Sequence, residues 1–156
     1  MKNLRIVLSF LLFPLSIIYG ILVFIRNKMY DQGILKSHSF KIPLISVGNI
    51  TVGGTGKTPH IEYLADLLRE EFNLATLSRG YKRKSKDFRI VTNESTVKEA
   101  GDEPLQIKQK FPDITVAVDR NRVNGVKSLK EKIPDLDVVL LDDAYQHRKI
   151  KVNLSI

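Results

Sequence analysis

The sequence predicts an α/β fold in which a mostly parallel sheet is covered by helices on both faces and follows an apolar N-terminal helix. Three observations predict it. Apolar runs of four or five residues alternate along the chain with segments whose apolar residues recur at helical spacing. Such runs are typical of parallel strands that are buried on both faces. In addition, residues 6–25 contain no charged side chain.

The N-terminal run is long enough to cross a membrane. Twenty residues of α-helix are about 30 Å long, which matches the hydrocarbon core of a bilayer. Pro14 and Gly20 interrupt the run, but membrane helices tolerate both. A secretory signal would need small residues at a cleavage site after the run, and residues 24–28 are a poor site. We therefore expect residues 1–28 to be a membrane-anchoring helix that spans the bilayer or lies in its interface, with a buried core helix as the alternative.

The composition favours anionic partners. The chain has 156 residues, enough for one domain with a hydrophobic core. Its 25 Lys and Arg stand against 17 Asp and Glu, a net charge of +8, which attracts phosphates, nucleic acid or an acidic membrane surface. It has no Cys, so disulfides and thiolate metal sites are excluded.

Residues 29–41 are predicted to connect the anchor to an α/β unit at residues 42–156. The predicted strands are residues 44–47, 74–77, 88–91, 114–118, 138–141 and 151–156. Three helices are predicted between them from their apolar residues: Ile61, Leu64, Ala65 and Leu68 in the first, Leu105 and Ile107 in the second, and Val126, Leu129 and Ile133 in the third. The chain stops within the last strand, so we expect the unit to be incomplete at its C-terminus.

A phosphate-binding loop is predicted between the first strand and the first helix. Its residues are Gly53, Gly54, Thr55, Gly56, Lys57 and Thr58. This context is the one a P-loop requires, so the predicted fold is of the P-loop NTPase type. The glycines let backbone N–H groups approach phosphate oxygens, Lys57 would reach the β- and γ-phosphates of ATP, and Thr58 would hold Mg²⁺. Thr51 stands where the usual pattern has Gly.

Two carboxylates, Asp142 and Asp143, follow the apolar residues 138–141. Ligands of open α/β sheets bind at the carboxyl ends of strands, and an Asp at that place can hold Mg²⁺ directly or through its waters. Together with Thr58 and Glu103, these two residues are the candidate metal ligands.

The run Gly101-Asp102-Glu103-Pro104 has two interpretations. Two acids before a Pro can cap the following helix. A kinase that acts on hydroxyl groups also needs a carboxylate to position or deprotonate the alcohol, and Asp102 and Asp119 are the candidates for that role.

The segment from Arg79 to Arg89 is strongly basic, with Asp87 as its single acid. Such a segment is a solvated loop or faces a phosphorylated substrate or lipid headgroups. Tyr81 is its lone aromatic residue, too little for a stacking platform, so we expect no nucleic-acid partner.

Four motifs together make the chain resemble the tetraacyldisaccharide 4'-kinase family, the lipid A 4'-kinases. In order, they run from Ser46 to Pro59, from Leu77 to Tyr81, from Gly101 to Pro104 and from Asp142 to Arg148. The sequence departs mildly from the family at Lys82, where a Gly is usual, and at Ala144-Tyr145, where Gly-Phe is usual.

The resemblance implies transfer of the ATP γ-phosphoryl group, with Mg²⁺, to the 4'-hydroxyl of a lipid A disaccharide 1-phosphate. It implies that this occurs at the cytoplasmic face of the bacterial inner membrane, with the N-terminal helix docked on the lipid surface. Asp102 carries over as the candidate catalytic base. Arg79, Tyr81, Gln146 and His147 are the candidate substrate contacts.

Family members are longer, with a second lobe that closes the site and supplies a His. We therefore expect this chain to be an N-terminal portion without that lobe, an inactive fragment being one possibility. The alternative function is a membrane-attached switch NTPase of the partitioning and targeting type. Those proteins have a Lys where Val52 stands here, which disfavours this alternative.

Overall fold

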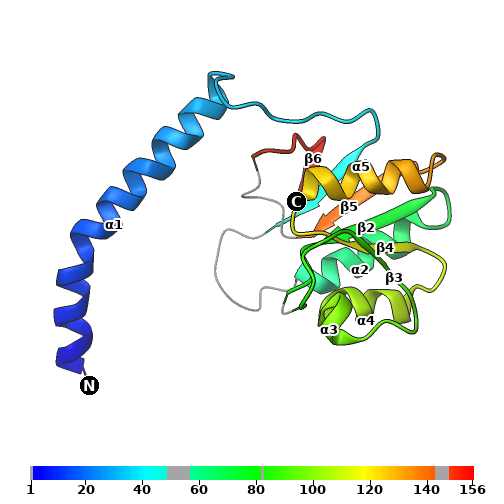
Figure 1. The fold of residues 1–156 in the computed structure, drawn as a ribbon, viewed down its shortest axis with the longest axis horizontal. Coiled ribbons are helices and arrows are strands. Elements are labelled where there is room, and N and C mark those ends of the chain that lie inside the picture. The colour runs from blue at the N-terminus through cyan, green and yellow to red at the C-terminus, as the bar shows by residue number, and fades with distance from the viewer. Residues whose placement is uncertain (1, 49–56, 82, 143–147) are drawn as a thin grey trace. The chain divides into compact units, whose positions relative to one another are not determined.

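The computed structural model describes residues 2–48, 57–81, 83–142 and 148–156, with their side chains except those of residues 2–11 and Lys57. Figure 1 shows a long N-terminal helix, α1 (Lys2–Asp31), and an α/β unit. The strands of this unit are β1 (Leu44–Val47), β2 (Leu74–Ser78), β3 (Arg89–Val91), β4 (Thr115–Val118), β5 (Val138–Asp142) and β6 (Leu154–Ser155). Its helices are α2 (Lys57–Leu68), α3 (Val97–Ala100), α4 (Asp102–Lys110) and α5 (Arg122–Lys132).

The chain divides into two compact units, residues 1–37 and residues 38–156. In the first unit α1 continues through Pro14. Gly33, just after the helix, adopts a left-handed conformation with a φ of 73°. The stretch Leu12–Asp31 is long and apolar enough to cross a membrane, and its large apolar side chains are exposed. The anchoring role of this helix stays a prediction.

The second unit is built on a six-stranded sheet with the order β3-β4-β2-β5-β1-β6. All neighbouring strands are parallel except β3 and β4, which are antiparallel. The register pairs Val47 of β1 with Asp142 of β5, and Ser78 of β2 with Val118 of β4. The predicted α/β class with a mostly parallel sheet is therefore confirmed.

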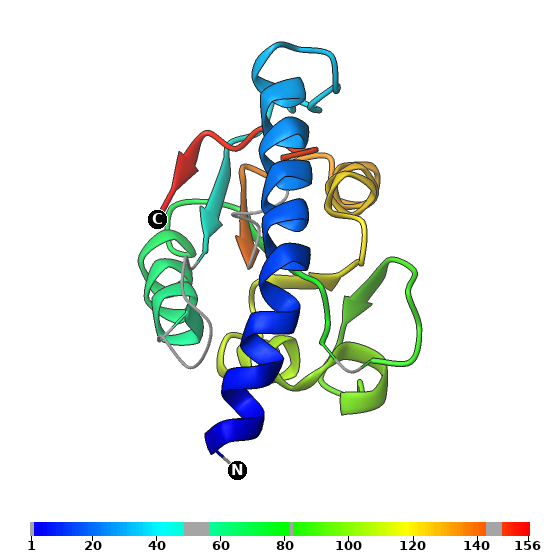
Figure 2. The same cartoon turned by 90° about the vertical axis from the view of Figure 1, so that its left-hand side faces the viewer.

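Helices cover both faces of the sheet, and Figure 2 shows α2 and α5 on opposite sides of it. Leu129 of α5 is buried in one core cluster with Leu141 of β5. Ile61 of α2 and Ile107 of α4 are buried in the other cluster with Leu140 of β5. Successive side chains of a strand point to opposite faces, so a strand between two helical layers is apolar throughout, as the sequence predicted for residues 138–141.

Two local features differ from the sequence predictions. The short helix α3 was not predicted, because four residues are too few to show a helical period. It is stabilised at its start by Glu99, whose Oε2 accepts hydrogen bonds from the Thr96 N–H and hydroxyl at 2.9 Å each. At the C-terminus, β6 is shorter than the predicted strand 151–156, although Asn153 and Ile156 on either side of it also donate backbone hydrogen bonds to Leu44 and Ser46 of β1.

Candidate nucleotide and acceptor site

The carboxyl ends of β1, β2, β4 and β5 lie at one edge of the sheet because these strands are parallel. The chain leaves that edge at Gly48, Arg79 and Asp119, and β5 ends there at Asp142. The predicted phosphate loop, basic segment and acidic pair are thus far apart in sequence but start from one edge. Ligands of open α/β sheets bind at such an edge.

The phosphate loop lies mostly outside the described residues. Gly53, Gly54, Thr55 and Gly56 are not among them, and α2 begins at Lys57, whose side chain is not described. Thr58 is half-buried in the first turn of α2. The strand-loop-helix context that a P-loop requires is present, since β1 ends at Val47 and the helix begins at Lys57.

A buried arginine ties the ends of two strands together. Arg122, at the start of α5, is 3% exposed. Its Nη1 donates to the backbone oxygen of Asp119 at 3.0 Å, and its Nη2 donates to that of Asp142 at 2.7 Å. Because one acceptor ends β5 and the other follows β4 at the site edge, Arg122 connects the β4 and β5 ends across β2.

The predicted metal ligands are brought together in part. Asp142 is buried and pairs in register with Val47, the last residue of β1. Glu103 is exposed on α4. Asp143 lies outside the described residues, and within these residues no group of three or more His, Asp or Glu side chains could hold a metal ion. Thr58 and Asp142 supply oxygen ligands, the kind Mg²⁺ prefers, and the metal site stays a prediction.

Asp119 is not available to an acceptor hydroxyl. The residue is 2% exposed. Its Oδ1 accepts from the Asn121 N–H at 2.7 Å, and its Oδ2 accepts from the Asn124 side-chain amide at 2.7 Å. Both partners belong to the start of α5, so this carboxylate holds the β4–α5 turn and is a poor candidate for the base.

Asp102 has the accessibility that a base requires. It is the first residue of α4 and is exposed, as is Glu103 after it. The N-cap of α4 is Gly101, and no side chain makes a cap hydrogen bond. The interpretation of these acids as helix caps is therefore wrong, because they lie inside the first turn. Gly101 takes the cap position with a φ of 92°, which favours glycine.

The basic segment is structured. Arg89 on β3 pairs with Glu99 of α3, with 2.7 Å between Nη1 and Oε1. The Arg83 guanidinium donates to three backbone oxygens of the same segment, those of Arg79, Lys86 and Asp87. The described residues 79–81 and 83–87 are therefore folded around Arg83, which differs from the solvated loop that the composition allowed.

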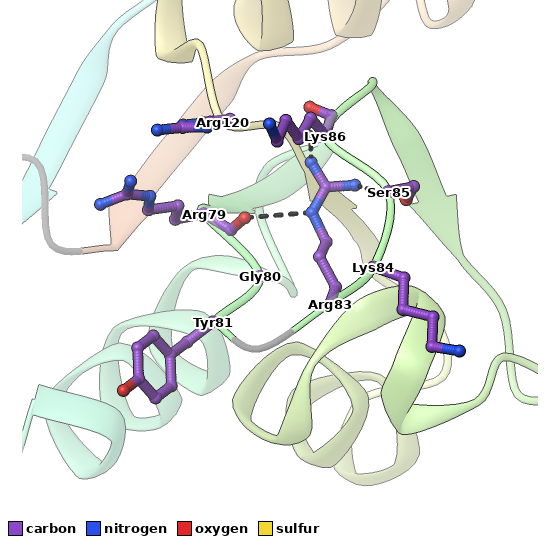
Figure 3. A pocket seen from close by; sticks show the side chains of 8 residues that line it. All are labelled: Arg79, Gly80, Tyr81, Arg83, Lys84, Ser85, Lys86 and Arg120. Carbon is purple, nitrogen blue, oxygen red and sulfur yellow. Dashed lines mark hydrogen bonds between the residues drawn. The ribbon is translucent and has the colours of Figure 1, made fainter.

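A cavity of about 320 Å³ opens beside this segment. It is lined by Arg79, Gly80, Tyr81, Arg83, Lys84, Ser85, Lys86 and Arg120, as drawn in Figure 3. The side chains of Arg79, Lys86 and Arg120 point to the same side, whereas that of Lys84 points away. No acidic side chain is among the described residues that line the cavity, so it favours an anion.

Of the predicted substrate contacts, Arg79 and Tyr81 meet at this cavity, while Gln146 and His147 lie outside the described residues. Sequence reasoning noted Arg83 only as one member of the basic segment, and it missed Arg120 and Arg122. The last two could have been noticed because they follow a predicted strand end closely. Arg83 had no such signal, because its contacts depend on how the loop closes.

Comparison with known families identifies the chain. The model of the tetraacyldisaccharide-1-P 4'-kinase family matches residues 8–156. The chain belongs to this family. The resemblance seen in the four sequence motifs is therefore confirmed, and the kinase is favoured over the switch NTPase.

Two relatives and one solved structure illustrate the similarity. The tetraacyldisaccharide 4'-kinases of Bacteroides thetaiotaomicron and Flavobacterium johnsoniae are 54% and 56% identical to it, over 93% and 94% of this chain. The chain spans 38% and 43% of those two proteins. The crystal structure of LpxK from Aquifex aeolicus in complex with ATP has a TM-score of 0.85 and 41% identity, covering 95% of this chain and 48% of the other.

Proposed function

We propose that this protein is an ATP-dependent kinase that transfers the γ-phosphoryl group to the 4'-hydroxyl of a lipid A disaccharide 1-phosphate. The observation that carries the proposal is the family match over residues 8–156. The relatives that bear this activity in their names are longer than this chain, so the activity is proposed for the whole protein.

The nucleotide end of the site is assigned to α2 and the loop before it. The backbone of Gly53, Gly54, Thr55 and Gly56 would cradle the phosphates, and Lys57 would neutralise charge on the β- and γ-phosphates. Mg²⁺ would be held by Thr58 and by Asp142, Asp143 and Glu103, and it would neutralise negative charge on the phosphates. The crystal structure of the Aquifex aeolicus protein in complex with ATP supports the choice of nucleotide.

The acceptor end is assigned to Asp102 and the basic cavity. Asp102 would take the proton of the 4'-hydroxyl as that oxygen bonds to the γ-phosphorus, and the bond to the leaving ADP breaks. The exposed carboxylate of Asp102 supports this role, because its position leaves it open to a substrate. Arg79 and Tyr81, together with Gln146 and His147, would contact the sugar and its phosphate.

We assign α1 to attachment at the inner membrane, on the cytoplasmic face where ATP is present. The exposed apolar side chains between Leu12 and Asp31 support this assignment. Moving such side chains from water into lipid is favourable by about 25 cal/mol per Å² of buried apolar area. A lipid acceptor and its enzyme then meet at one surface.

The test is phosphate transfer by the full-length protein. Incubation with γ-labelled ATP, Mg²⁺ and a tetraacyldisaccharide 1-phosphate should give a labelled bisphosphate lipid. Lys57→Ala should abolish transfer, since it leaves phosphate charge without a neutralising partner, whereas Lys132→Ala, at the end of α5, should retain it. No transfer by the parent protein would contradict the proposed function, and full activity of Lys57→Ala would contradict the phosphate-loop assignment.

A further inference from the structure

The Arg83 guanidinium lies at the centre of residues 79–87 and bonds both ends of this segment. Its Nε donates to the Arg79 oxygen at 3.2 Å. Its Nη1 donates to the Asp87 oxygen at 2.7 Å and to the Ser85 hydroxyl at 3.2 Å, and its Nη2 donates to the Lys86 oxygen at 2.9 Å. Figure 3 shows the chain curving around this side chain. A single side chain therefore closes the loop.

The five N–H groups of a guanidinium form a fixed planar fork, and a lysine ammonium has a different geometry. Burial lowers the pKa of Arg83, while the nearby carboxylates of Asp119 and Asp87 raise it. An arginine remains charged throughout the physiological range. Charge and fork geometry are thus separable by substitution, because lysine keeps the first and loses the second.

The folded segment packs directly on the residue before Asp102. A Cβ on Gly101 would lie 2.9 Å from the Tyr81 oxygen and 3.2 Å from Gly80 backbone atoms. A Cβ on Gly80 would lie 2.5 Å from the Cδ of Arg83. The backbones of residues 80–81 and residue 101 are therefore in close contact, and the Arg83 stem fills the space beside Gly80.

Two backbone hydrogen bonds extend these contacts to the neighbouring elements. The Lys84 N–H donates to the Lys98 oxygen of α3 at 2.9 Å. On the other side, the Arg120 N–H donates to the Lys86 oxygen at 3.5 Å, and Lys86 O also accepts from Arg83. The segment thus connects the α3–α4 turn to the end of β4.

We propose that Arg83 is a positioning residue, which holds residues 79–81 and 83–87 in the shape that places Arg79 and the Asp102 turn on one acceptor site. The role rests on the proposed kinase function, because Asp102 and Arg79 belong to its acceptor end. The hydrogen bonds of Arg83 go to backbone oxygens and to the Ser85 hydroxyl of its own segment, so it acts through these two residues.

The test compares Arg83→Gln, Arg83→Lys and the control Arg89→Gln in the full-length protein. Arg89→Gln removes a guanidinium from the same basic segment, but one that pairs with the half-exposed Glu99. A small displacement of reacting groups costs about 10²-fold in rate. Both Arg83 variants should lose about that much in kcat/KM for the lipid acceptor, with the KM for ATP nearly unchanged, and Arg89→Gln should stay close to the parent.

Hydrogen exchange without any lipid gives a second readout. Peptides that cover residues 83–87 and 119–121 should exchange faster in both Arg83 variants than in Arg89→Gln, while α5 keeps its protection. If the parent protein transfers no phosphate, the proposed function is wrong. The comparison of hydrogen exchange between the variants would still decide whether Arg83 holds the loop.

Four outcomes would overturn the positioning role. Parent-like activity of Arg83→Lys would mean that charge alone matters. An equal fold loss in kcat/KM for ATP and for the lipid acceptor would remove the link to the acceptor site. Unchanged hydrogen exchange in residues 83–87 would do the same. Loss of cooperative unfolding in Arg83→Lys, which keeps the charge and most of the stem, would make Arg83 a general stabilising residue.

Discussion

Asp102 differs from Asp119 in what each carboxylate can reach. Asp119 is buried and accepts two hydrogen bonds from the start of α5, so its protonation or movement would disturb the turn. Asp102 is exposed in the first turn of α4, where a negative charge is favoured by the helix dipole. The residue before it, Gly101, takes over the cap, which leaves the Asp102 side chain open to a substrate.

Asp102→Asn should lower turnover by about 10²–10⁴-fold, the usual contribution of general-base catalysis. An amide cannot accept the proton as a carboxylate does. The affinity for ATP should be unchanged, because Lys57 and the phosphate loop are untouched. Steady-state kinetics and ATP titration of the full-length variant check both parts.

Stability should also stay close to that of the parent, since Asp102 makes no cap bond and exposed surface substitutions change the free energy of unfolding by about 0.5 kcal/mol or less. If the turnover of Asp102→Asn stays within about threefold of the parent, the loss is far smaller than general-base catalysis contributes. Asp102 would then not be the catalytic base.

At the scale of elements, α2 and α4 are joined by one carboxylate. Glu62 of α2 accepts from the Lys110 ammonium at 2.6 Å and from the Gln106 amide at 2.7 Å. The bond from Lys110 is the main reason why the pKa of Glu62 lies below its ordinary value, although burial opposes the shift. The two joined helices begin with Lys57 and Asp102, so this contact links the nucleotide and acceptor ends of the candidate site.

Glu62→Gln should lower the free energy of unfolding by about 1 kcal/mol at neutral pH, the typical net value of an intramolecular hydrogen bond. A group whose pKa is lowered by folding stabilises the protein above its unfolded pKa, here about 4.3, and loses that contribution as pH falls through the folded pKa. The difference between parent and variant should therefore shrink below about pH 4.

Urea unfolding at several pH values measures this difference. Glu131→Gln, an exposed acid on α5, is the control and should show little effect at any pH. A Glu62→Gln penalty that persists unchanged in acid would mean that the carboxylate charge is not its source.

For the whole molecule, two units of different character share one chain. Residues 1–37 contain α1, most of whose described apolar side chains are exposed, and residues 38–156 contain two core clusters on either side of the sheet. A water-exposed apolar surface of this size is typical of a membrane or partner contact. The division of the chain therefore matches the proposed division between membrane attachment and chemistry.

Deletion of residues 1–31 should shift the full-length protein from the membrane fraction to the soluble fraction. The deletion removes the apolar area that would be buried in lipid, and that burial stabilises attachment by about 25 cal/mol per Å². Fractionation by sedimentation measures the change, and the double variant Lys84→Gln/Lys86→Gln tests attachment by the basic segment. If the deletion variant still sediments with membranes and the double variant does not, the basic segment is the main anchor.

The sequence by itself determined the class of the fold and the family. The period of apolar residues marks strands and helices because that period is a property of the local backbone, and the phosphate loop is recognisable because its glycines and Lys57 are contiguous. Four motifs, each made of contiguous residues, were enough for the family resemblance. Helix α3 was missed because a single turn held by Thr96 and Glu99 has no period to read.

The tertiary structure decided the strand order and the contacts between segments that are distant in sequence. The ends of β4 and β5 are separated by one strand, β2, and Arg122 donates hydrogen bonds to both of them. Only the strand order places these two ends within the reach of one side chain. Asp119 and Asp102 were both candidates from the residues alone, and only the family resemblance favoured Asp102. Burial in the folded structure separates the two. The role of Arg83 likewise depends on where the carbonyl groups of its own loop point, since hydrogen-bond direction is set by folded backbone geometry and is not encoded in residue type.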